Sequence, residues 1–344
     1  MIDDRTLKIL VTRLTPERTV SLSFSHKFIL DLLERRFNKS VFVDYFFFPE
    51  YKKFISLKNN KFQGAVSQKA GMDISKFDVI AVSNSFQLEL INLFHLLSIL
   101  KVPFKLKDRL KDEKIPLIIA GGVNTPSIAA ITGAPEGTSG MPDDGSSSLV
   151  DAIFMGEAET NLPAFIKTLL TDPDWKKNKY EILGKASQNI AGVYFPPAYI
   201  HQFERSGLNG ETALAAIVPA VGKDSPLTPA RSSYIENIDT AHEFNGSIFD
   251  DSPNDATMPV EISRGCASMC SFCKEGYTQK PYREKSADEV VKTCCRLRDE
   301  TGISRFNLYS YNFSDHSHIH EIVKGLAERY MEAEVKSQRA DTAL

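Results

Sequence analysis

Short apolar runs alternate with longer amphipathic stretches through the first half of the chain. In the longer stretches, apolar residues recur three or four positions apart, as at Phe28, Leu32, Leu33 and Phe37, which predicts helices that pack one face on a core. Strands that alternate with helices form a parallel sheet covered by helices, so this half is predicted to be a Rossmann-like α/β domain. The expected strands span residues 20–24, 41–47, 78–83, 116–120 and 152–155, and the expected helices span 26–37, 86–100 and 160–170.

The same alternation restarts at Met258 and predicts successive βα units of a barrel. Ser286 and Glu289 form a predicted capping box at the start of the first helix of these units. Residues 258–344 provide only 87 positions, whereas a complete eight-unit barrel takes about 250 residues. The predicted barrel is therefore incomplete: either the chain is a fragment of a longer product, which we favour, or the remaining strands come from elsewhere. The expected elements are strands at 258–262, at 305–311 and from about 334, and helices at 286–300 and 317–332.

These patterns divide the chain into three parts. The Rossmann-like domain is expected over residues 1–190, a connecting segment with an acidic linker over 191–256, and the start of the barrel over 257–344. Within the first part, residues 133–148 consist mainly of Gly, Ser, Pro, Asp and Thr and contain almost nothing to bury. They are predicted to form a flexible surface insertion.

Composition and charge restrict the class of protein. A chain of 344 residues with 42% hydrophobic and 25% charged residues is ordinary for a globular protein of about two domains. The net charge of -3 gives no overall attraction to nucleic acid or anionic lipid. The longest apolar run, 88–100, contains Glu89, Asn92 and His95 and is too short to span a bilayer, so no membrane partner is expected. Without a hydrophobic leader, and with an odd number of cysteines, the chain is expected to be cytoplasmic and free of disulfides.

Three of the five cysteines, Cys266, Cys270 and Cys273, lie in one short loop after the strand at 258–262. Three thiolates can hold three irons of a cubane [4Fe-4S] cluster and leave the fourth iron open, whereas a closed cluster takes four cysteines. Structural zinc is the alternative, but zinc prefers four ligands in two spaced pairs. The other cysteines, Cys294 and Cys295, are adjacent in a predicted helix, where their side chains point about 100° apart and are expected to be core or partly buried thiols.

The Cys-x3-Cys-x2-Cys loop resembles the signature loop of the radical S-adenosylmethionine (SAM) superfamily. The order and spacing of further pieces resemble the class of this superfamily with an N-terminal cobalamin-binding-type domain, and most closely a fused bacterial subfamily. The resemblance implies that the open iron chelates SAM and that one electron from the cluster cleaves it to a 5'-deoxyadenosyl radical. The matching pieces are residues 77–85, 118–124, 152–159, 192–196 and 266–286.

The resemblance also implies binding residues beside the cysteines. Phe272 matches an aromatic near the SAM adenine, and its alternative is an aromatic that anchors the loop in the core. Ser310 or Asn312 is expected to contact SAM where the family often has Gly-Gly-Glu. Arg264, Arg283 and Lys285 either tune the charge of the cluster or contact an anionic substrate, or they are ordinary surface charges. His316, His318 and His320 invite a metal interpretation, although solvated or helix-capping histidines fit the helical pattern better.

A second ligand site is expected in the N-terminal domain. Gly121, Gly122 and Gly156 follow predicted strands at the edge where parallel sheets bind ligands, and their alternative is a purely structural role in tight βα turns. Cobalamin is a candidate ligand there, but the chain lacks the Asp-x-His-x-x-Gly sequence of proteins that bind cobalt through histidine.

The leading functional hypothesis is a radical SAM enzyme, or a fragment of one, with SAM and a [4Fe-4S] cluster as cofactors. Its electron donor would be a flavodoxin or a ferredoxin, and its substrate, RNA or protein among the candidates, is unknown. Methyl transfer is favoured if cobalamin binds. The alternative is a non-catalytic protein that uses the cysteine loop to hold a cluster or zinc for structure or electron transfer.

Overall fold

The computed structural model describes residues 6–16, 25–60, 64–131, 147–206, 211–220, 231–241, 257–335 and 337–339. The expected strand at 20–24 and nearly all of the expected insertion at 133–148 lie outside these residues. The chain divides into two compact units, Met1–Tyr234 and Ile235–Leu344. The division therefore falls inside the segment expected to connect two domains.

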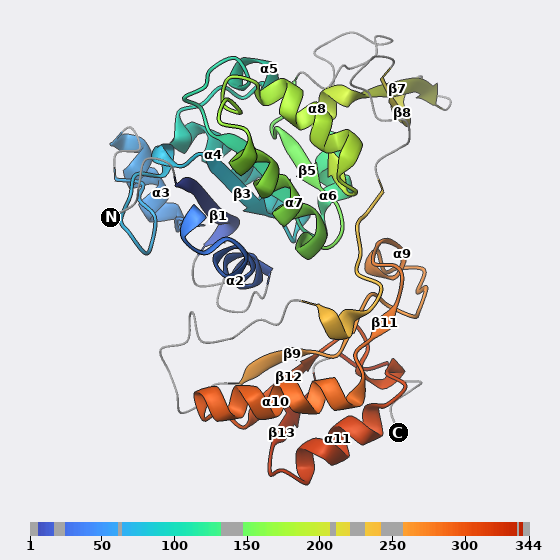
Figure 1. Ribbon diagram of the computed structural model, residues 1–344. Coiled ribbons are helices and arrows are strands. Elements are labelled where there is room, and N and C mark those ends of the chain that lie inside the picture. Colours follow the sequence, from blue (N-terminus) through green and yellow to red (C-terminus); the bar gives the residue numbers. More distant parts are fainter. Residues whose placement is uncertain are drawn as a thin grey trace. The chain divides into compact units, whose positions relative to one another are not determined.

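The first unit is built on a six-stranded sheet, which confirms the predicted α/β class (Figure 1). Its first five strands in chain order are parallel, and the sixth joins antiparallel to the fifth. Every residue of the central β3 is buried, as expected for a parallel strand covered on both faces. The order across the sheet is β2 (Val41–Phe48), β1 (Leu7–Pro16), β3 (Val79–Ser83), β4 (Leu117–Gly121), β5 (Ala152–Phe154) and β6 (Val193–Tyr194).

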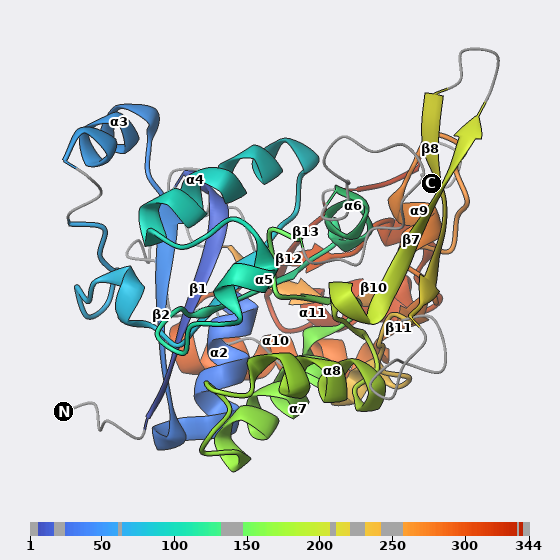
Figure 2. The same ribbon diagram turned by 90° about the horizontal axis from the view of Figure 1, so that it is seen from above.

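Helices cover both faces of this sheet. The helices α2 (Ser25–Phe37) and α7 (Ala158–Thr171) lie on one face, and α4 (Ile91–Leu100) lies on the other (Figures 1 and 2). These three confirm the predicted helices, with the residues before α4 forming a separate 3₁₀ turn, η3 (Gln87–Leu90). The remaining helices of the unit are α3 (Tyr51–Asn59), α5 (Leu106–Arg109), α6 (Thr125–Ile131) and α8 (Lys179–Asn189).

The sequence patterns missed the strand β1, which lies second in the sheet between β2 and β3. Its residues are almost all buried, but Thr12 and Arg13 interrupt its apolar run and obscure the pattern of a strand. The segment after α8 was expected to form small strands between domains. Its first strand, β6, instead completes the sheet, and β7 (Tyr199–Ser206) pairs with β8 (Glu211–Pro219) as an antiparallel hairpin.

The second unit contains a parallel sheet of three strands in the order β13 (Glu332–Glu334), β12 (Arg305–Tyr309) and β9 (Met258–Glu261). Two helices, α10 (Ala287–Thr301) and α11 (Ile319–Ala327), connect these strands. In the described residues these strands do not close into a barrel, which agrees with the incomplete barrel expected from the length. One face of the sheet joins the helices in an apolar core that includes Val260, Phe306, Leu308, Val290 and Ile322.

Local predictions at the ends of the helices are partly correct. The Ser286 side chain accepts from the Glu289 amide at 3.3 Å, as the capping box predicts. The Ser286 amide, which Glu289 was expected to bind, donates instead to Asp239 Oδ1 at 2.8 Å. The helix expected to run to residue 332 ends at Ala327, and Tyr330 in the left-handed region (φ 54°) turns the chain into β13. None of the helices in the described residues has the length and apolar character needed to cross a membrane.

Candidate functional site

The three clustered cysteines lie in a loop that leaves the carboxyl end of β9. A short antiparallel pair closes the loop, with β10 (Ser263–Arg264) against β11 (Arg283–Glu284), and the loop contains the one-turn helix α9 (Glu275–Thr278) (Figure 1). The carboxyl ends of parallel strands are where βα folds place their ligands. The cysteine loop therefore occupies the edge of the sheet at which a ligand site is expected.

Hydrogen bonds within the loop define its shape around the cysteines. The Cys266 amide donates to Gln279 O at 3.3 Å, and the Cys273 amide donates to Cys270 O at 2.9 Å. The Tyr277 hydroxyl donates to Met269 O at 3.0 Å, and the Lys280 ammonium donates to Cys266 O. These bonds hold both ends of the loop together while they leave the sulfur atoms uninvolved.

The thiols of Cys266, Cys270 and Cys273 are all partly exposed and free of disulfides. Cys294 differs, because it is fully buried in the core of α10, where burial raises its pKa to about 12. This confirms that Cys294 is a core thiol, and Cys295 is partly buried as expected. The three loop thiols therefore are accessible to a metal, although no three His, Cys, Asp or Glu side chains in the described part of the chain converge on a single ion.

The end of β12 brings polar groups to the same edge. Asn312 is buried, and its Nδ2 atom, like the Ser310 hydroxyl, has no hydrogen-bond partner among the described residues. Buried donors without partners are rare and call for an explanation, such as a bound ligand. Tyr311 lies between Ser310 and Asn312 in the sequence, and burial raises its pKa. The negative charges that Tyr309, Glu275, Cys273 and Cys266 can carry raise this pKa further. The Tyr311 phenol thus stays protonated beside the cysteine loop.

Phe272 is the most exposed aromatic of the loop, with 91% of its surface accessible. The alternative that this ring anchors the loop in the core therefore does not hold in this structure. Met269, in the same loop, is also exposed. Two apolar side chains thus stand beside the three thiols, where they can cover a ligand.

The basic residues and histidines near the loop mostly contact the fold itself. Arg264 pairs with Glu261 at 2.9 Å, Arg283 donates to Pro281 O at 3.1 Å, and Lys285 is buried. His316 is buried, with Nε2 3.0 Å from Lys285 O, while His318 is exposed. His318 and His320 are exposed, as expected of solvated histidines, whereas His316 is buried and its Nδ1 accepts from the His318 amide at 3.1 Å.

Sequence reasoning missed two charged residues beside the sulfur atoms. Glu275 Oε2 lies 3.5 Å from Cys273 Sγ, and Arg339 Nη1 lies 4.0 Å from Cys270 Sγ. The position of Glu275, two residues after Cys273, is the one hint that the sequence contained. Arg339 is 69 residues away from Cys270, so no local pattern could have identified it.

In the first unit, the glycine turns at the carboxyl edge of the sheet are packed against the chain's own backbone. A Cβ atom on Gly122 (φ 111°) would lie 2.3 Å from Asn84 O, and one on Gly156 (φ 91°) would lie 2.0 Å from Ser233 O. Gly121 meets only ordinary contacts with Phe154. These close approaches explain why two of the positions require glycine without any ligand, and a ligand role for the three remains a prediction.

Buried polar side chains fill the same edge of the first unit. Arg13 pairs with Glu89 at 3.0 Å, the Asn84 amide donates to Glu89 Oε2 at 3.1 Å, and the Asn124 amide donates to Asn84 Oδ1 at 2.8 Å. The network joins the ends of β1, β3 and β4. These side chains bond to one another, while Arg13 Nε has no hydrogen-bond partner among the described residues.

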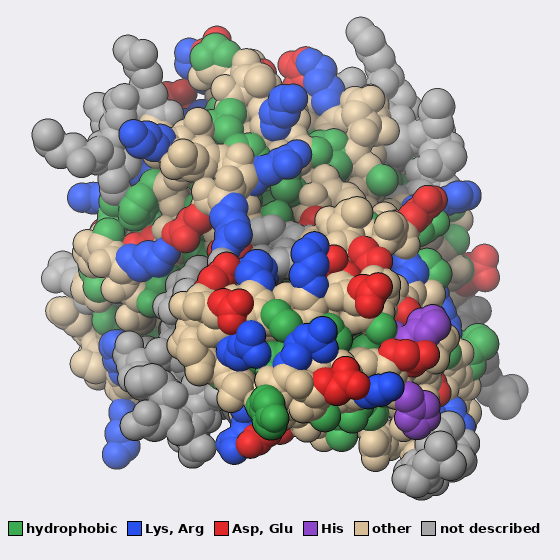
Figure 3. All heavy atoms as spheres, turned by 60° about the horizontal axis from the view of Figure 1, so that its bottom comes forward, with side chains coloured by type: hydrophobic (Ala, Val, Ile, Leu, Met, Phe, Trp, Pro, Cys, Tyr) green, Lys and Arg blue, Asp and Glu red, His purple; other side chains and the backbone are tan. Residues whose placement is uncertain are grey.

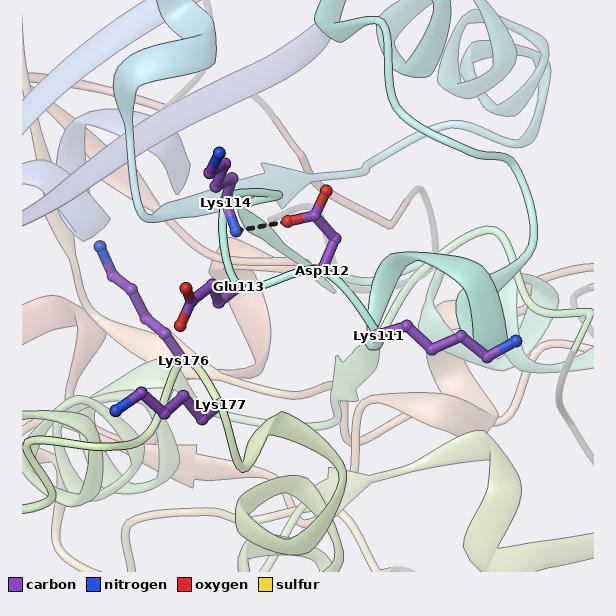
Figure 4. Close-up of a pocket in the computed structure, with 6 residues that line it drawn as sticks. All are labelled: Lys111, Asp112, Glu113, Lys114, Lys176 and Lys177. Atoms are coloured by element: carbon purple, nitrogen blue, oxygen red, sulfur yellow. Dashed lines mark hydrogen bonds between the residues drawn. The ribbon is translucent and has the colours of Figure 1, made fainter.

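Two surfaces of the described residues carry charged side chains of both signs. A hollow of about 370 Å³ lies at the opposite, amino edge of the first sheet, and its lining residues are Lys111, Lys114, Lys176, Lys177, Asp112 and Glu113 (Figure 4). Basic and acidic side chains are also interspersed along α10 and α11 (Figure 3), where the ion pairs include Glu289–Lys292, Arg296–Glu300 and Lys324–Glu328. Acidic residues therefore accompany the basic ones on both surfaces.

The chain is similar to known proteins of the radical SAM group. Residues 26–196 match the family model described as radical SAM proteins, N-terminal. The chain is 25% identical over 267 residues to cytidylyl-2-hydroxyethylphosphonate methyltransferase of Streptomyces wedmorensis, and the match covers 73% of this chain and 43% of the relative.

Two solved structures of the radical SAM methyltransferase TsrM from Kitasatospora setae are also similar. One has cobalamin and a [4Fe-4S] cluster bound, with 11% identity and a TM-score of 0.48. The other has a tryptophan substrate and the SAM analogue aza-SAM bound, with 12% identity and a TM-score of 0.46. Each match covers 94% of this chain and 51% of the TsrM chain. The chain thus spans about half, or less, of the length of the relatives it matches.

Proposed function

Because this chain belongs to the radical SAM superfamily, we propose that Cys266, Cys270 and Cys273 hold a [4Fe-4S] cluster that binds and reductively cleaves SAM. The observation that carries the proposal is the donor set: three partly exposed thiols, free of disulfides, on one loop at the carboxyl end of β9. Three thiolates suit a cubane with one open iron, whereas a structural zinc site requires a fourth ligand. The residues present therefore fit the cluster.

When bound, such a cluster supplies the electron that cleaves the sulfonium of SAM and releases a 5'-deoxyadenosyl radical. The chain's own residues would bind and orient SAM and shield it from solvent. Phe272 and Met269 are exposed beside the thiols, and we assign Phe272 to the adenine of SAM. The unpartnered Ser310 hydroxyl and Asn312 Nδ2 are assigned to polar groups of SAM, because a bound ligand would give both their missing partner.

We derive no step through cobalamin. At the carboxyl edge of the first sheet, the backbone of Asn84 and Ser233 occupies the space beside Gly122 and Gly156, and the polar network of Arg13, Glu89, Asn84 and Asn124 is internally bonded. His26 is buried edge-on against Phe47, with ring centroids 5.3 Å apart. The described residues of this edge therefore do not fit a cobalamin ligated by histidine.

The chain spans about half, or less, of the length of the relatives it matches, so the reaction that follows SAM cleavage is open to assay. The relative from Streptomyces wedmorensis is a methyltransferase, so methyl transfer is the first reaction to assay. The donor of the electron would be a flavodoxin or a ferredoxin. Modification of RNA or protein by another route is the next reaction to assay.

Anaerobic reconstitution with iron and sulfide, followed by electron paramagnetic resonance (EPR) with and without SAM, tests the proposal. We expect about four irons per chain, a spectrum that changes when SAM is added, and release of 5'-deoxyadenosine under reducing conditions. Alanine at Cys266, Cys270 or Cys273 should abolish the SAM-dependent change. Cys295→Ala is the matched control, because this thiol is also partly exposed but lies on α10.

The same experiment separates the proposal from the non-catalytic alternative. A cluster whose spectrum is unmoved by SAM would favour a structural or electron-transfer role. Binding of one zinc per chain in place of iron would contradict the proposal altogether.

A further inference from the structure

Two side chains of opposite charge lie against different sulfur atoms of the cysteine loop. Arg339 Nη1 is 4.0 Å from Cys270 Sγ, and Glu275 Oε2 is 3.5 Å from Cys273 Sγ. Neither residue belongs to the Cys-x3-Cys-x2-Cys pattern. The loop thus has a positive neighbour at one thiol and a negative neighbour at another.

Arg339 is held in this position by contacts with two separate segments. Its backbone amide donates to Asn312 Oδ1 at 3.2 Å, and its Nη1 atom donates to the Ser268 hydroxyl at 2.6 Å. Nearby, the Phe313 amide donates to Ser337 O at 2.9 Å. Ser337 and Arg339 are therefore attached to the end of β12, and the Arg339 guanidinium reaches the cysteine loop.

A charge at this distance affects a metal cluster through its sulfur ligands. Reduction adds one negative charge to an iron-sulfur cluster, and the potential depends on net charge and on hydrogen bonds to the sulfur atoms. A guanidinium beside Cys270 stabilises the more negative, reduced state. The Glu275 carboxylate beside Cys273 opposes that state.

We propose that Arg339 is a positioning residue for the cluster, which ties Ser268 to the end of β12 and places a positive charge against the Cys270 sulfur. In this position Arg339 raises the reduction potential of the bound cluster, and Glu275 lowers it. The inference rests on the proposed function, because it presupposes a cluster on the three cysteines.

The test is a redox titration of the reconstituted full chain, followed by EPR, in the unaltered protein and four variants. Arg339→Gln removes the charge and should shift the midpoint potential to a lower value. Arg339→Lys keeps the charge, so its midpoint potential should stay close to that of the unaltered protein. Glu275→Gln should move the potential in the opposite direction, to a higher value. Arg296→Gln is the matched control, since it removes an arginine that pairs with Glu300 on α10, and it should leave the potential unchanged.

The outcomes separate this inference from the proposed function. A potential of Arg339→Gln equal to that of Arg296→Gln, with a normal iron content, would overturn the inference and leave the proposed function intact. If Arg339→Gln takes up no iron but Arg339→Lys assembles a cluster of normal potential, the requirement for the charge is supported. Loss of iron in both variants would overturn the role of the charge. If the unaltered chain takes up no iron, both the proposed function and this inference are wrong.

Discussion

Arg109 and Asp151 form an ion pair in which neither side chain is accessible to solvent, with Arg109 Nη2 2.8 Å from Asp151 Oδ1. Further bonds satisfy both groups: Arg109 also donates to Pro103 O and Ser148 O, and Asp151 Oδ2 accepts from the Ile118 amide at 2.7 Å. The pair therefore connects the end of α5 to the residue that precedes β5.

Removal of one partner of this pair should strongly destabilise the first unit. We expect Asp151→Ala to lower the free energy of unfolding by about 3–5 kcal/mol, because an uncompensated guanidinium would remain buried. Urea denaturation measures the change. The matched control is Glu181→Ala, which breaks the exposed pair with Lys185 and should cost less than about 1 kcal/mol. An equal loss of unfolding free energy in the two variants would contradict the claim that burial makes the Arg109–Asp151 pair important for stability.

Substitution of Gly156 should also destabilise the fold. The residue has φ 91°, and an added Cβ would lie 2.0 Å from Ser233 O. We expect Gly156→Ala to cost at least about 2 kcal/mol, because backbone strain and a backbone clash act together. Gly71→Ala is the control: φ is 62° there and no atom lies within 4 Å of the added carbon, so strain acts alone. In thermal unfolding, the midpoint temperature of Gly156→Ala should be well below that of Gly71→Ala.

Ser310→Ala should separate ligand binding from folding. The Ser310 hydroxyl is buried without a partner among the described residues, so its removal should leave the stability of the second unit unchanged or slightly higher. If the hydroxyl contacts SAM, the affinity of the reconstituted protein for SAM should fall about tenfold. Titration of the SAM-dependent EPR change measures this affinity. A variant that is destabilised but binds SAM normally would show that the hydroxyl serves the fold alone.

Acid should weaken the first unit through His26. Burial lowers the pKa of His26 from 6.5 to about 3, and the positive charges of Lys27 and Arg13 contribute in the same direction. The folded state keeps this imidazole neutral while the unfolded chain takes up a proton below pH 6.5, so stability is lost as the pH falls from 6.5 towards 3. Between pH 7 and pH 5, this group alone should cost about 2 kcal/mol.

Urea midpoints at the two pH values test this prediction. His26→Gln, which cannot titrate, should lose most of the difference that the unaltered protein shows. An equal loss of stability in both proteins would assign the acid sensitivity to other groups.

The sequence by itself determined the features that depend on neighbouring residues. The three-to-four-residue recurrence of apolar side chains located α2, α4 and α7, and Ser286 marked the start of α10. The spacing of Cys266, Cys270 and Cys273 predicts a metal site, and that site stays a prediction. Each of these signals lies within one helical turn or one loop, so that chain connectivity alone brings the residues together.

Only the tertiary structure decided the features that depend on distant segments. The place of β1 between β2 and β3 follows from pairing with strands far along the chain, and its polar Thr12 and Arg13 hid it from the hydrophobic pattern. Likewise, Arg339 meets Cys270 because the parallel strands β9, β12 and β13 bring their carboxyl ends to one edge. The exposure of Phe272 and the burial of Cys294 are equally results of packing, because solvent access depends on which surfaces other segments cover.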